Sequence, residues 1–484
     1  MSKTKTQERP PVVSIVSLGC AKNEVDTERI LGKLAEAGFL ISGDPAEADI
    51  ALVNTCGFIH DAREESAGVL RELQKLKRGG SLKSVVALGC LVERAQGASE
   101  LSGFLDAADA RIGFNDYPKL AEICRDLATK PAVTKSKSPD GVAVKIGDKR
   151  FRSLSGEARS FTQSYGEFLT APRMRVGSPH IAHLKISEGC SNFCKFCSIP
   201  YIRGVQVSRP IEDIVTEAQQ LLEGGAAELS LIAQDTTSYG RDIYGDYKLA
   251  ELLKKLLAIK GDHWLRLMYA FPRFLTDEMI EVLASDPRMC PYIDMPLQHI
   301  SDRMLSNMGR GMGKRDTLAL LDRIAKKMPH GAIRTTFIVG YPGETETEFN
   351  DLVAFVKEGR FSHVGAFMYS HEPRTPAGQL DDAIPMAEKK RRRDELMLAQ
   401  LEVSQKRLAN FVGQEIEVML DGAIPPGSPV PQGVGAVGRS RLEAHDVDGV
   451  IFLKGRGLAK IAPGTRLKTR VTKSLDYDLV AEVA

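Results

Sequence analysis

Three near-continuous apolar runs lie in the first part of the chain, and each ends in a cysteine. They cover residues 13–20, 50–56 and 84–90. Runs of this length are typical of strands that are buried on both faces of a parallel sheet. Helical periodicity lies between them, roughly over 24–37 and 61–76. The order strand–helix–strand–helix–strand predicts a parallel sheet with right-handed crossover connections.

From about residue 178 to 375, apolar runs alternate with helical patterns six times. Helices are predicted, for example, over 211–222 and 345–358. Six βα units fall short of a complete eight-stranded barrel, so a partial (βα)6 barrel is expected. The six predicted strands are 181–187, 228–233, 264–271, 292–295, 333–340 and 364–370.

The last part of the chain changes pattern twice. A charged helix is predicted over 389–408, and its basic opening run 389–393 is interpreted as a solvated face. Beyond it, short strands separated by Gly and Pro turns predict a small five-stranded, OB-like β-barrel. The strand candidates in this part are 415–420, 449–453 and 466–472.

These patterns divide the chain into five segments. They are a disordered tail (1–11), a parallel-sheet domain (12–128), a basic linker (129–175), the barrel with its helix (176–410) and the small β-barrel (411–484). The tail has no apolar core of the kind that a signal peptide carries. The linker contains ten Lys and Arg against four Asp and Glu. A solvated connector is the favoured interpretation, and contact with RNA is the alternative.

Composition sets limits on the function. The 484 residues suffice for about three domains. The 65 Lys and Arg nearly balance the 63 Asp and Glu, which gives no general argument for nucleic-acid binding. No apolar run has the length of a membrane span. We therefore expect a cytoplasmic protein with no membrane partner, whose eight thiols stay reduced and available for metal.

Three of the cysteines, Cys190, Cys194 and Cys197, form the run CxxxCxxC without a fourth cysteine nearby. A closed structural zinc or iron–sulfur site usually has four protein ligands. Three thiolates on a 4Fe–4S cluster leave one iron free to bind another molecule. The alternative is a zinc site completed by His180 or His183, although zinc sites favour CxxC pairs. The run follows the first predicted barrel strand, at the end where such folds carry their active sites.

The other three candidate ligands, Cys20, Cys56 and Cys90, each end a predicted strand of the first domain. Loops at the carboxyl ends of parallel strands form the ligand crevice of such sheets. We therefore expect the three thiols to meet there, where they could hold a second cluster. The alternative is three small, buried cysteines. Cys124 and Cys290 have no comparable setting and are interpreted as structural.

Polar residues at the ends of later strands are further candidates for ligand contacts. Gln234 and Asp235 end the second barrel strand, and Gln298 and His299 the fourth. The run 340–344 follows the fifth strand, and its glycines would let backbone approach a ligand closely. Each of these residues could instead cap a helix or make a turn.

The run CxxxCxxC, with Phe196 before its last cysteine, resembles the radical S-adenosylmethionine (SAM) enzymes, in which the open iron binds SAM. The stretches 17–23, 54–59 and 88–90 resemble the methylthiotransferase branch of these enzymes. The resemblance implies a flavodoxin-like N-terminal domain, a partial barrel and a terminal TRAM domain. It also implies two 4Fe–4S clusters and SAM as cofactors, with SAM contacted near Gln234 and Asp235. The implied ligands are Cys20, Cys56 and Cys90 for the auxiliary cluster, and Cys190, Cys194 and Cys197 for the SAM cluster.

Methylthiotransferases differ mainly in substrate. One class modifies an N6-isopentenyladenosine of tRNA, and the other the β-carbon of an aspartate in ribosomal protein S-twelve. The stretches 54–59, 233–240 and 438–440 resemble the ribosomal class. The last domain, 412–484, contains nine Lys and Arg and nine Asp and Glu, and a neutral barrel binds phosphate poorly. The ribosomal class is therefore favoured, with the tRNA class, and a zinc-containing RNA-binding protein, as alternatives.

The resemblance also implies a mechanism and partners. One SAM is cleaved reductively to a radical that takes hydrogen from the aspartate β-carbon, sulfur comes from the auxiliary cluster, and a second SAM supplies the methyl group. The partners implied are protein S-twelve or the small ribosomal subunit, and reduced flavodoxin or ferredoxin as electron donor. The cofactors carry the hard chemistry, and the protein binds, orients and excludes water.

Overall fold

The computed structural model describes residues 9–80, 82–96, 98–129, 168–425 and 427–483. These residues form two compact units. The first contains the chain up to Val176, together with the short segments Gly189–Ser191 and Ser198–Val205. The second contains the rest, including the C-terminal barrel. The predicted tail and linker fall largely on residues 1–8 and 130–167, which lie outside the described residues.

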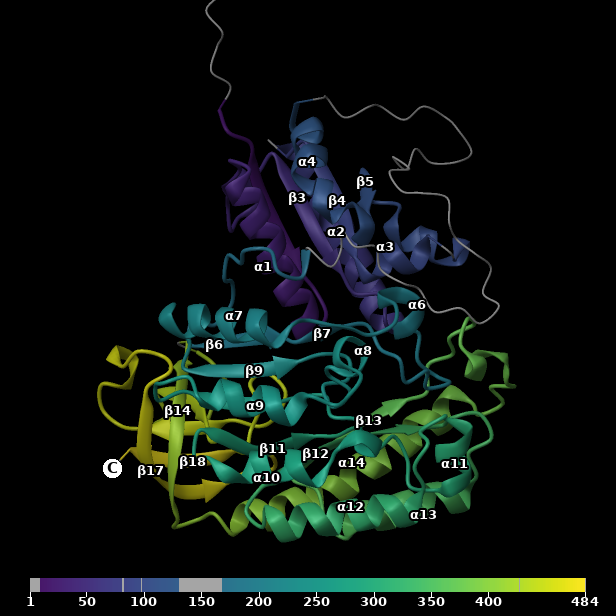
Figure 1. Cartoon of the computed structure of the whole chain (residues 1–484), viewed down its shortest axis with the longest axis vertical. Helices are drawn as coiled ribbons and strands as arrows, with labels where there is room; N and C mark the ends of the chain where they lie inside the picture. The colour runs from purple at the N-terminus through teal and green to yellow at the C-terminus, as the bar shows by residue number, and fades with distance from the viewer. Residues whose placement is uncertain (1–8, 81, 97, 130–167, 426, 484) are drawn as a thin grey trace, which may run out of the picture. The chain divides into compact units, whose positions relative to one another are not determined.

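The first unit is built on a parallel five-stranded sheet in the order β2-β1-β3-β4-β5 (Figure 1). Residues of β3 and β4 are buried along their whole length, which is why they lack polar alternation. The predicted flavodoxin-like sheet is confirmed, and two short edge strands, β2 and β5, are added. The strands are β1 Val12–Ser17, β2 Leu40–Ile41, β3 Ile50–Thr55, β4 Ser84–Gly89 and β5 Ala110–Ile112.

Helices cover this sheet, and two apolar cores flank it. They are α1 Ala21–Glu36, α2 His60–Gly79, α3 Cys90–Ala95, α4 Leu120–Thr129 and, from the segment after the cysteine run, α6 Ile199–Arg203. Ile202 of α6 belongs to the same core as Phe168, at the end of the predicted linker. Arg173 pairs there with Glu28 of α1. The end of the predicted linker is thus folded onto the first unit.

The second unit contains a parallel six-stranded sheet in the order β13-β12-β11-β10-β9-β6. Each strand lies beside its predecessor in the chain, which confirms the predicted partial (βα)6 barrel. The strands are β6 Ile181–Lys185, β9 Glu228–Ile232, β10 Trp264–Leu267, β11 Met289–Asp294, β12 Ala332–Val339 and β13 His363–Met368, and β7 Ser187–Glu188 pairs with β8 Val207–Ser208.

The helices of this barrel bury one apolar face against the sheet in the largest core of the protein. They are α7 Ile211–Glu223, α9 Leu249–Leu257, α10 Asp277–Ser285, α12 Lys314–Lys327, α13 Glu346–Lys357 and α14 Met386–Ala409. Two shorter helices lie outside this core: α8 Arg241–Tyr244 has no buried residue, and α11 Asp302–Asn307 packs in a smaller cluster with Tyr341 and Tyr369. No helix among the described residues combines the length and the apolar character that a membrane crossing requires.

The basic run at the start of α14 is only partly solvated, which corrects the expectation of an exposed face. Lys389 and Arg392 are buried. Lys389 Nζ donates to both carboxylate oxygens of Asp382 at 2.7 Å, and Arg392 Nη1 donates to Glu344 at 2.7 Å. Two of the five basic residues therefore fasten the helix to the barrel loops.

The C-terminal residues form a closed barrel in the order β14-β15-β16-β18-β17, with a core of its own. The strands are β14 Glu415–Ala423, β15 Ala436–Arg439, β16 Ile451–Lys454, β17 Arg466–Ser474 and β18 Leu479–Val483. Arg439 is 1 % exposed and bridges Asp421 of this barrel and Glu228 at the start of β9. Arg266 pairs with the same Glu228 at 2.7 Å. The predicted small barrel is confirmed, and a buried ion-pair network joins it to the larger sheet.

Candidate iron–sulfur and SAM site

The first cysteine set lies at the carboxyl ends of three adjacent strands. Cys20 precedes α1 after β1, Cys56 directly follows β3, and Cys90 directly follows β4 and begins α3. Because β1, β3 and β4 are neighbours in a parallel sheet, their carboxyl ends share one edge. Cys20 is exposed, Cys56 is half-buried and Cys90 is buried. Residues 70 positions apart in sequence are thus brought to the same side of the sheet.

The sequence Leu-Gly-Cys occurs twice at this edge for a steric reason. Gly19 and Gly89 have φ values of +93° and +91°, which L-residues rarely adopt. A Cβ on Gly19 would lie 2.9 Å from Cys56 Cβ, and one on Gly89 would lie 2.3 Å from Asn54 Oδ1. Glycine therefore lets the neighbouring strand end approach each cysteine.

Neutral side chains tie the three strand ends together. Asn23 Nδ2 donates to the carbonyls of Leu18 at 2.8 Å and of Thr55 at 3.2 Å. Asn54 Nδ2 donates back to the Asn23 carbonyl at 2.9 Å. Thr55 Oγ1 donates to the Leu88 carbonyl at 2.7 Å. These bonds satisfy buried backbone groups that the strands leave unpaired where they end, and they fix the loops that carry the cysteines.

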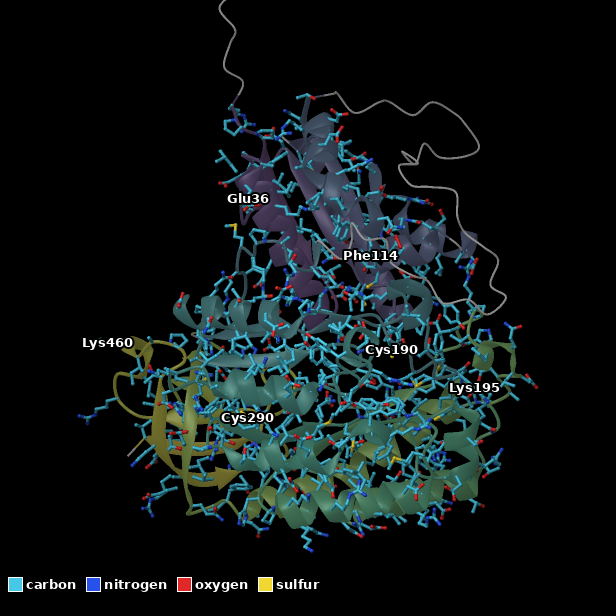
Figure 2. The ribbon with its side chains drawn as sticks, viewed as in Figure 1. Glu36, Phe114, Cys190, Lys195, Cys290 and Lys460 are labelled. Carbon is cyan, nitrogen blue, oxygen red and sulfur yellow. The ribbon has the colours of Figure 1, made fainter. Side chains whose placement is uncertain are left out.

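Arg203, at the end of α6, places its charge among these residues. Its Nε donates to Cys90 Sγ at 3.2 Å, and its Nη1 donates to Asp26 at 2.8 Å. Its Nη2 donates to Asn23 Oδ1, and the guanidinium lies 4.9 Å from the centre of the Phe114 ring. Phe114 is labelled in Figure 2. Arg203 is 2 % exposed, so its charge is buried.

The three thiols have different electrostatic surroundings. Burial raises the pKa of Cys90 to about 12, although the nearby Arg203 opposes this shift. Burial also raises the pKa of Cys56. Desolvation opposes ionisation of Cys20, but the charges of Lys22 and Arg203 outweigh it and lower the pKa. Iron–sulfur clusters bind thiolates, and cationic and amide groups around three thiols suit such a ligand set.

The residues of the second cysteine set are described unit by unit. Cys190, labelled in Figure 2, groups with the first unit, and Cys194 and Cys197 group with the second. The amide of Cys190 donates to the Gly204 carbonyl at 3.0 Å. In the second unit, the amide of Cys197 donates to the Cys194 carbonyl at 3.0 Å, and Arg310 Nη1 donates to Cys194 Sγ at 3.3 Å.

Lys195, also labelled in Figure 2, anchors the run through its backbone rather than its side chain. Its amide donates to the Met308 carbonyl at 3.0 Å, and its carbonyl accepts from Ala377 at 2.9 Å. Phe193 adopts φ +49°, a left-handed conformation that is costly for a side chain of its size. The loop is therefore held in a defined conformation from two later parts of the barrel.

Gln234 and Asp235 lie beside the cysteine run, as their position after β9 implies. The Asp235 carboxylate accepts from Asn192 Nδ2 at 2.7 Å and also from Thr237 and Ser238. Its oxygens are thus engaged in holding the loop. Gln234 Nε2 donates to Glu188 Oε1 at 2.6 Å, whereas its Oε1 is buried without a hydrogen-bond partner. Of the two, Gln234 retains an acceptor for a ligand.

The ends of β11 and β12 contain a second polar cluster. His299 Nε2 contacts Glu344 Oε1 at 3.0 Å, and Glu344 Oε2 accepts from the Gly340 amide and from Arg392. His299 is therefore tied inside the protein. Gln298 has φ +74°, and its Oε1 is buried without a partner. An unusual backbone conformation with an unused acceptor is a common property of ligand-contacting residues.

The zinc alternative receives no support from the structure. His180 Nε2 lies 2.9 Å from Asp421 of the C-terminal barrel, so it is engaged there. Cys124 and Cys290 are fully buried, and burial raises the pKa of each to about 12. This agrees with their interpretation as structural.

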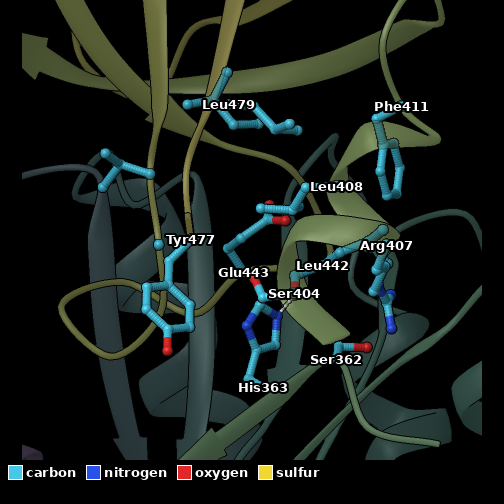
Figure 3. A pocket seen from close by; sticks show the side chains of 13 residues that line it. Ser362, His363, Ser404, Arg407, Leu408, Phe411, Leu442, Glu443, Tyr477 and Leu479 are labelled. Carbon is cyan, nitrogen blue, oxygen red and sulfur yellow. Dashed lines mark hydrogen bonds between the residues drawn. The ribbon is translucent and has the colours of Figure 1, made fainter. Parts of the chain in front are cut away.

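A small cavity lies elsewhere in the second unit, between α14, the start of β13 and the C-terminal barrel (Figure 3). Its walls include Arg407, Glu443 and Tyr477, and His363 Nε2 donates to the Leu442 carbonyl at 3.0 Å beside it. Its volume of about 20 Å³ has room for about one water molecule. It contains none of the candidate ligands and is not the functional site.

Comparison with known families defines the class of the protein. Residues 184–356 match the radical SAM superfamily, and residues 412–484 match the TRAM domain. Residues 12–113 match the family described as uncharacterized protein family UPF0004. The chain is therefore a radical SAM enzyme, a class that uses a 4Fe–4S cluster and SAM.

Relatives over nearly the full length give the family. A protein of Anaeromyxobacter sp. (strain Fw109-5) is 40 % identical over 97 % of this chain and 93 % of its own length. One of Geobacter sulfurreducens is 39 % identical over 97 % of this chain and 98 % of its own. Both are named ribosomal protein uS12 methylthiotransferase RimO. The chain belongs to this family of radical SAM methylthiotransferases.

Solved structures support the same fold. The radical SAM methyltransferase TsrM of Kitasatospora setae, with cobalamin and a [4Fe-4S] cluster bound, superposes with a TM-score of 0.52 at 15 % identity. The match covers 76 % of this chain and 77 % of that one. A second TsrM structure, with tryptophan and a SAM analogue bound, gives 0.51 at 14 % identity, over 87 % and 80 % of the two chains.

Two site residues, Arg203 and Arg310, were not found by sequence reasoning. Arg203 follows Cys197 by six positions, and Arg310 is far in sequence from all six candidate ligands. Arginine is common on protein surfaces, so neither position carries a signal of its own. Only the folded chain reveals that each guanidinium contacts a cysteine sulfur.

Proposed function

We propose that this protein methylthiolates the β-carbon of an aspartate of ribosomal protein S-twelve. The names of its relatives over nearly the full length support this substrate. We further propose that Cys20, Cys56 and Cys90 hold an auxiliary 4Fe–4S cluster, and that Cys190, Cys194 and Cys197 hold the SAM cluster. The carrying observation is the convergence of Cys20, Cys56 and Cys90 at one edge of a parallel sheet.

The residues around both cysteine sets fit iron–sulfur clusters. Each set offers three thiols, and each has an arginine that donates to a cysteine sulfur. Such clusters and SAM would together supply radical formation, sulfur and the methyl group. The chain's own part is to orient SAM and the substrate. Gln234 and Gln298 each offer a buried, unused oxygen for this purpose, because a free acceptor can bind the ammonium of SAM.

The C-terminal barrel supports a protein substrate more than an RNA substrate. Its equal numbers of basic and acidic residues provide little attraction for phosphate. Arg439, part of the stretch 438–440 that resembles the ribosomal class, is buried in the ion pairs with Glu228 and Asp421. Its role is therefore to dock the barrel rather than to contact the substrate.

The remaining partners follow from this function. Reductive cleavage of SAM requires a low-potential electron, for which reduced flavodoxin or ferredoxin is the expected donor. A ribosomal substrate implies work in the cytoplasm. Contact of the basic linker with RNA is retained as a proposal, although residues 130–167 lie outside the described chain.

Two measurements test the proposal. Anaerobic reconstitution should give about eight irons per chain and SAM cleavage under reductant, since each cluster contains four irons. Mass spectrometry of a deletion strain should show that protein S-twelve has lost its methylthio group, and that the intact gene restores it. A gene whose product has Cys56→Ala is the matched control, which should not restore it. Loss of the methylthio group from tRNA alone, with S-twelve unchanged, would establish the tRNA alternative instead.

A further inference from the structure

Each predicted cysteine set has one buried arginine that donates to a cysteine sulfur. Arg203 Nε lies 3.2 Å from Cys90 Sγ within the first unit. Arg310 Nη1 lies 3.3 Å from Cys194 Sγ within the second unit. The two arginines are 2 % and 6 % exposed. A buried cation next to a thiol is an unusual arrangement, because charges are rarely buried without a specific partner.

The two arginines are held by different groups. Arg203 forms an ion pair with Asp26 at 2.8 Å, so its charge is partly offset. Arg310 lies 4.0 Å from the centre of the Phe271 ring, and its Nη2 donates to the Pro296 carbonyl at 2.5 Å. Both guanidinium groups lie near an aromatic ring, but in the described chain Arg310 has a carbonyl where Arg203 has a carboxylate. Both guanidinium groups are fixed in direction by these contacts.

We propose that Arg203 and Arg310 are positioning residues, each of which fixes one cluster ligand and raises the reduction potential of the cluster on that ligand. This inference rests on the proposed two-cluster function. The potential of an iron–sulfur cluster depends on nearby charge and on hydrogen bonds to its sulfurs. A donating cation stabilises the more negative, reduced state. Residues behind the metal ligands often tune a site in this way.

The different partners predict different magnitudes. The carboxylate of Asp26 cancels part of the field of Arg203 at the first cysteine set. The charge of Arg310 is not offset by a carboxylate in the described chain. Removing Arg310 should therefore shift the potential of its cluster further than removing Arg203 shifts that of the other.

The test separates the two clusters by mutation in the full-length protein. Replacing Cys190, Cys194 and Cys197 by Ala leaves the first set alone, and replacing Cys20, Cys56 and Cys90 by Ala leaves the second. Arg203→Gln and Arg310→Gln are introduced one at a time into both backgrounds. A mediated redox titration, followed by electron paramagnetic resonance, measures the midpoint potential. In it each cluster takes one electron from the mediator, from its 2+ to its 1+ state, and no bond is broken.

We expect a crossed result. Arg203→Gln should make the potential of the first cluster more negative and leave the second unchanged, and Arg310→Gln should do the reverse, with the larger shift. A merely structural role would not move a midpoint potential selectively. Unchanged potentials in the matched backgrounds, or equal shifts in both backgrounds, would overturn the inference.

A second variant protects the test against misfolding. Arg203→Lys keeps a charge beside Asp26 but loses the planar fork that reaches Cys90 and Asn23 together. It should give a smaller negative shift than Arg203→Gln and faster loss of iron to a chelator, and wild-type behaviour in both would overturn the role of Arg203. A first background that binds no iron would refute the two-cluster function itself, whereas bound iron with unmoved potentials would refute only the role of the arginines.

Discussion

The loops that end the strands of the two units are tied in chemically different ways. In the first unit, the amides of Asn23 and Asn54 and the hydroxyl of Thr55 hold them. Arg94 adds a bond to the Gly57 carbonyl at 2.6 Å. In the second unit, carboxylates hold them, namely those of Asp235, Glu344 and Glu348. Amides do not titrate, whereas Glu348, whose pKa is lowered by its hydrogen bonds, loses its charge in acid. The two cysteine-bearing regions should therefore respond differently to mutation and to pH.

The cysteine sets also differ in how they are assembled. Cys190, Cys194 and Cys197 lie within a run of eight residues. Cys20, Cys56 and Cys90 come from three strand ends. A site of the second kind exists only when the sheet is formed. Damage to the sheet of the first unit should therefore affect the proposed cluster on Cys20, Cys56 and Cys90 and spare the other.

The largest expected effect comes from removing one set at a time. Replacing Cys20, Cys56 and Cys90 by Ala should abolish methylthiolation but preserve reductive SAM cleavage, with iron falling from about eight to about four per chain. Replacing Cys190, Cys194 and Cys197 by Ala should abolish both activities. Iron analysis and chromatography of 5′-deoxyadenosine measure the outcome. If the first variant also fails to cleave SAM, the two sites do not act separately.

Gly89→Ala should damage the first site through the sheet. The new Cβ would lie 2.3 Å from Asn54 Oδ1 at φ +91°, so we expect a loss of about 3 kcal/mol or more in the free energy of unfolding. The matched control is Gly38→Ala, at φ +85° with open space around it, which should cost only about 1 kcal/mol.

Urea unfolding of the two glycine variants gives these free energies, and iron analysis reports the first cluster. Gly89→Ala should lose iron at the first site and keep SAM cleavage. Equal losses of unfolding free energy in the two variants would show that the positive φ angle, and not the close approach of the strand ends, causes the destabilisation.

Acid should loosen the second unit through Glu348. Burial opposes its ionisation, but hydrogen bonds from Arg303, Thr345 and Ser301 outweigh this and lower its pKa to about 2. Because its folded pKa lies below the ordinary 4.5, its stabilising contribution is complete above that pH and is lost as the pH falls toward 2. Glu348→Gln should thus be less stable than the wild type near neutral pH, and the difference should shrink in acid.

Urea unfolding at about pH 6 and about pH 3 measures this difference, well above and well below the ordinary carboxyl pKa. Asn54→Asp in the first unit provides the comparison. It introduces a titrating carboxyl at a strand end that an amide otherwise holds. A stability difference for Glu348→Gln that is independent of pH would contradict the proposed tie.

The smallest effect is expected at the two structural cysteines, one in each unit. Cys124→Ala and Cys290→Ala should leave the iron content unchanged and cost about 1–2 kcal/mol of stability, because each removes a buried sulfur from a packed core. Thermal unfolding and iron analysis measure both quantities. A loss of about four irons from either variant would assign that cysteine to a cluster and break the division into two sets of three.

Much of the fold could be predicted from the sequence because it is encoded locally. Near-continuous apolar runs predicted the buried strands β3 and β4, and six alternations predicted the six-stranded sheet. The edge strands β2 and β5, of two and three residues, are too short to give a pattern. The prediction that the basic run of α14 is solvated was wrong because the residues that pair with Lys389 and Arg392 lie outside the helix, where a local pattern does not reveal them.

By itself, the sequence determined where the candidate thiols stand: two sets of three, one defined by local spacing and one by strand ends. Only the tertiary structure decided which charges surround them. Arg203 and Arg310 contact cysteines 113 and 116 residues away. Asp235, which was expected to contact SAM, accepts hydrogen bonds from Asn192, Thr237 and Ser238. Periodicity and spacing act between neighbours in the chain, whereas a buried charge is placed by contacts between distant segments. The sequence therefore indicates which thiols are candidates for the site, whereas the charges beside these thiols are set only by folding.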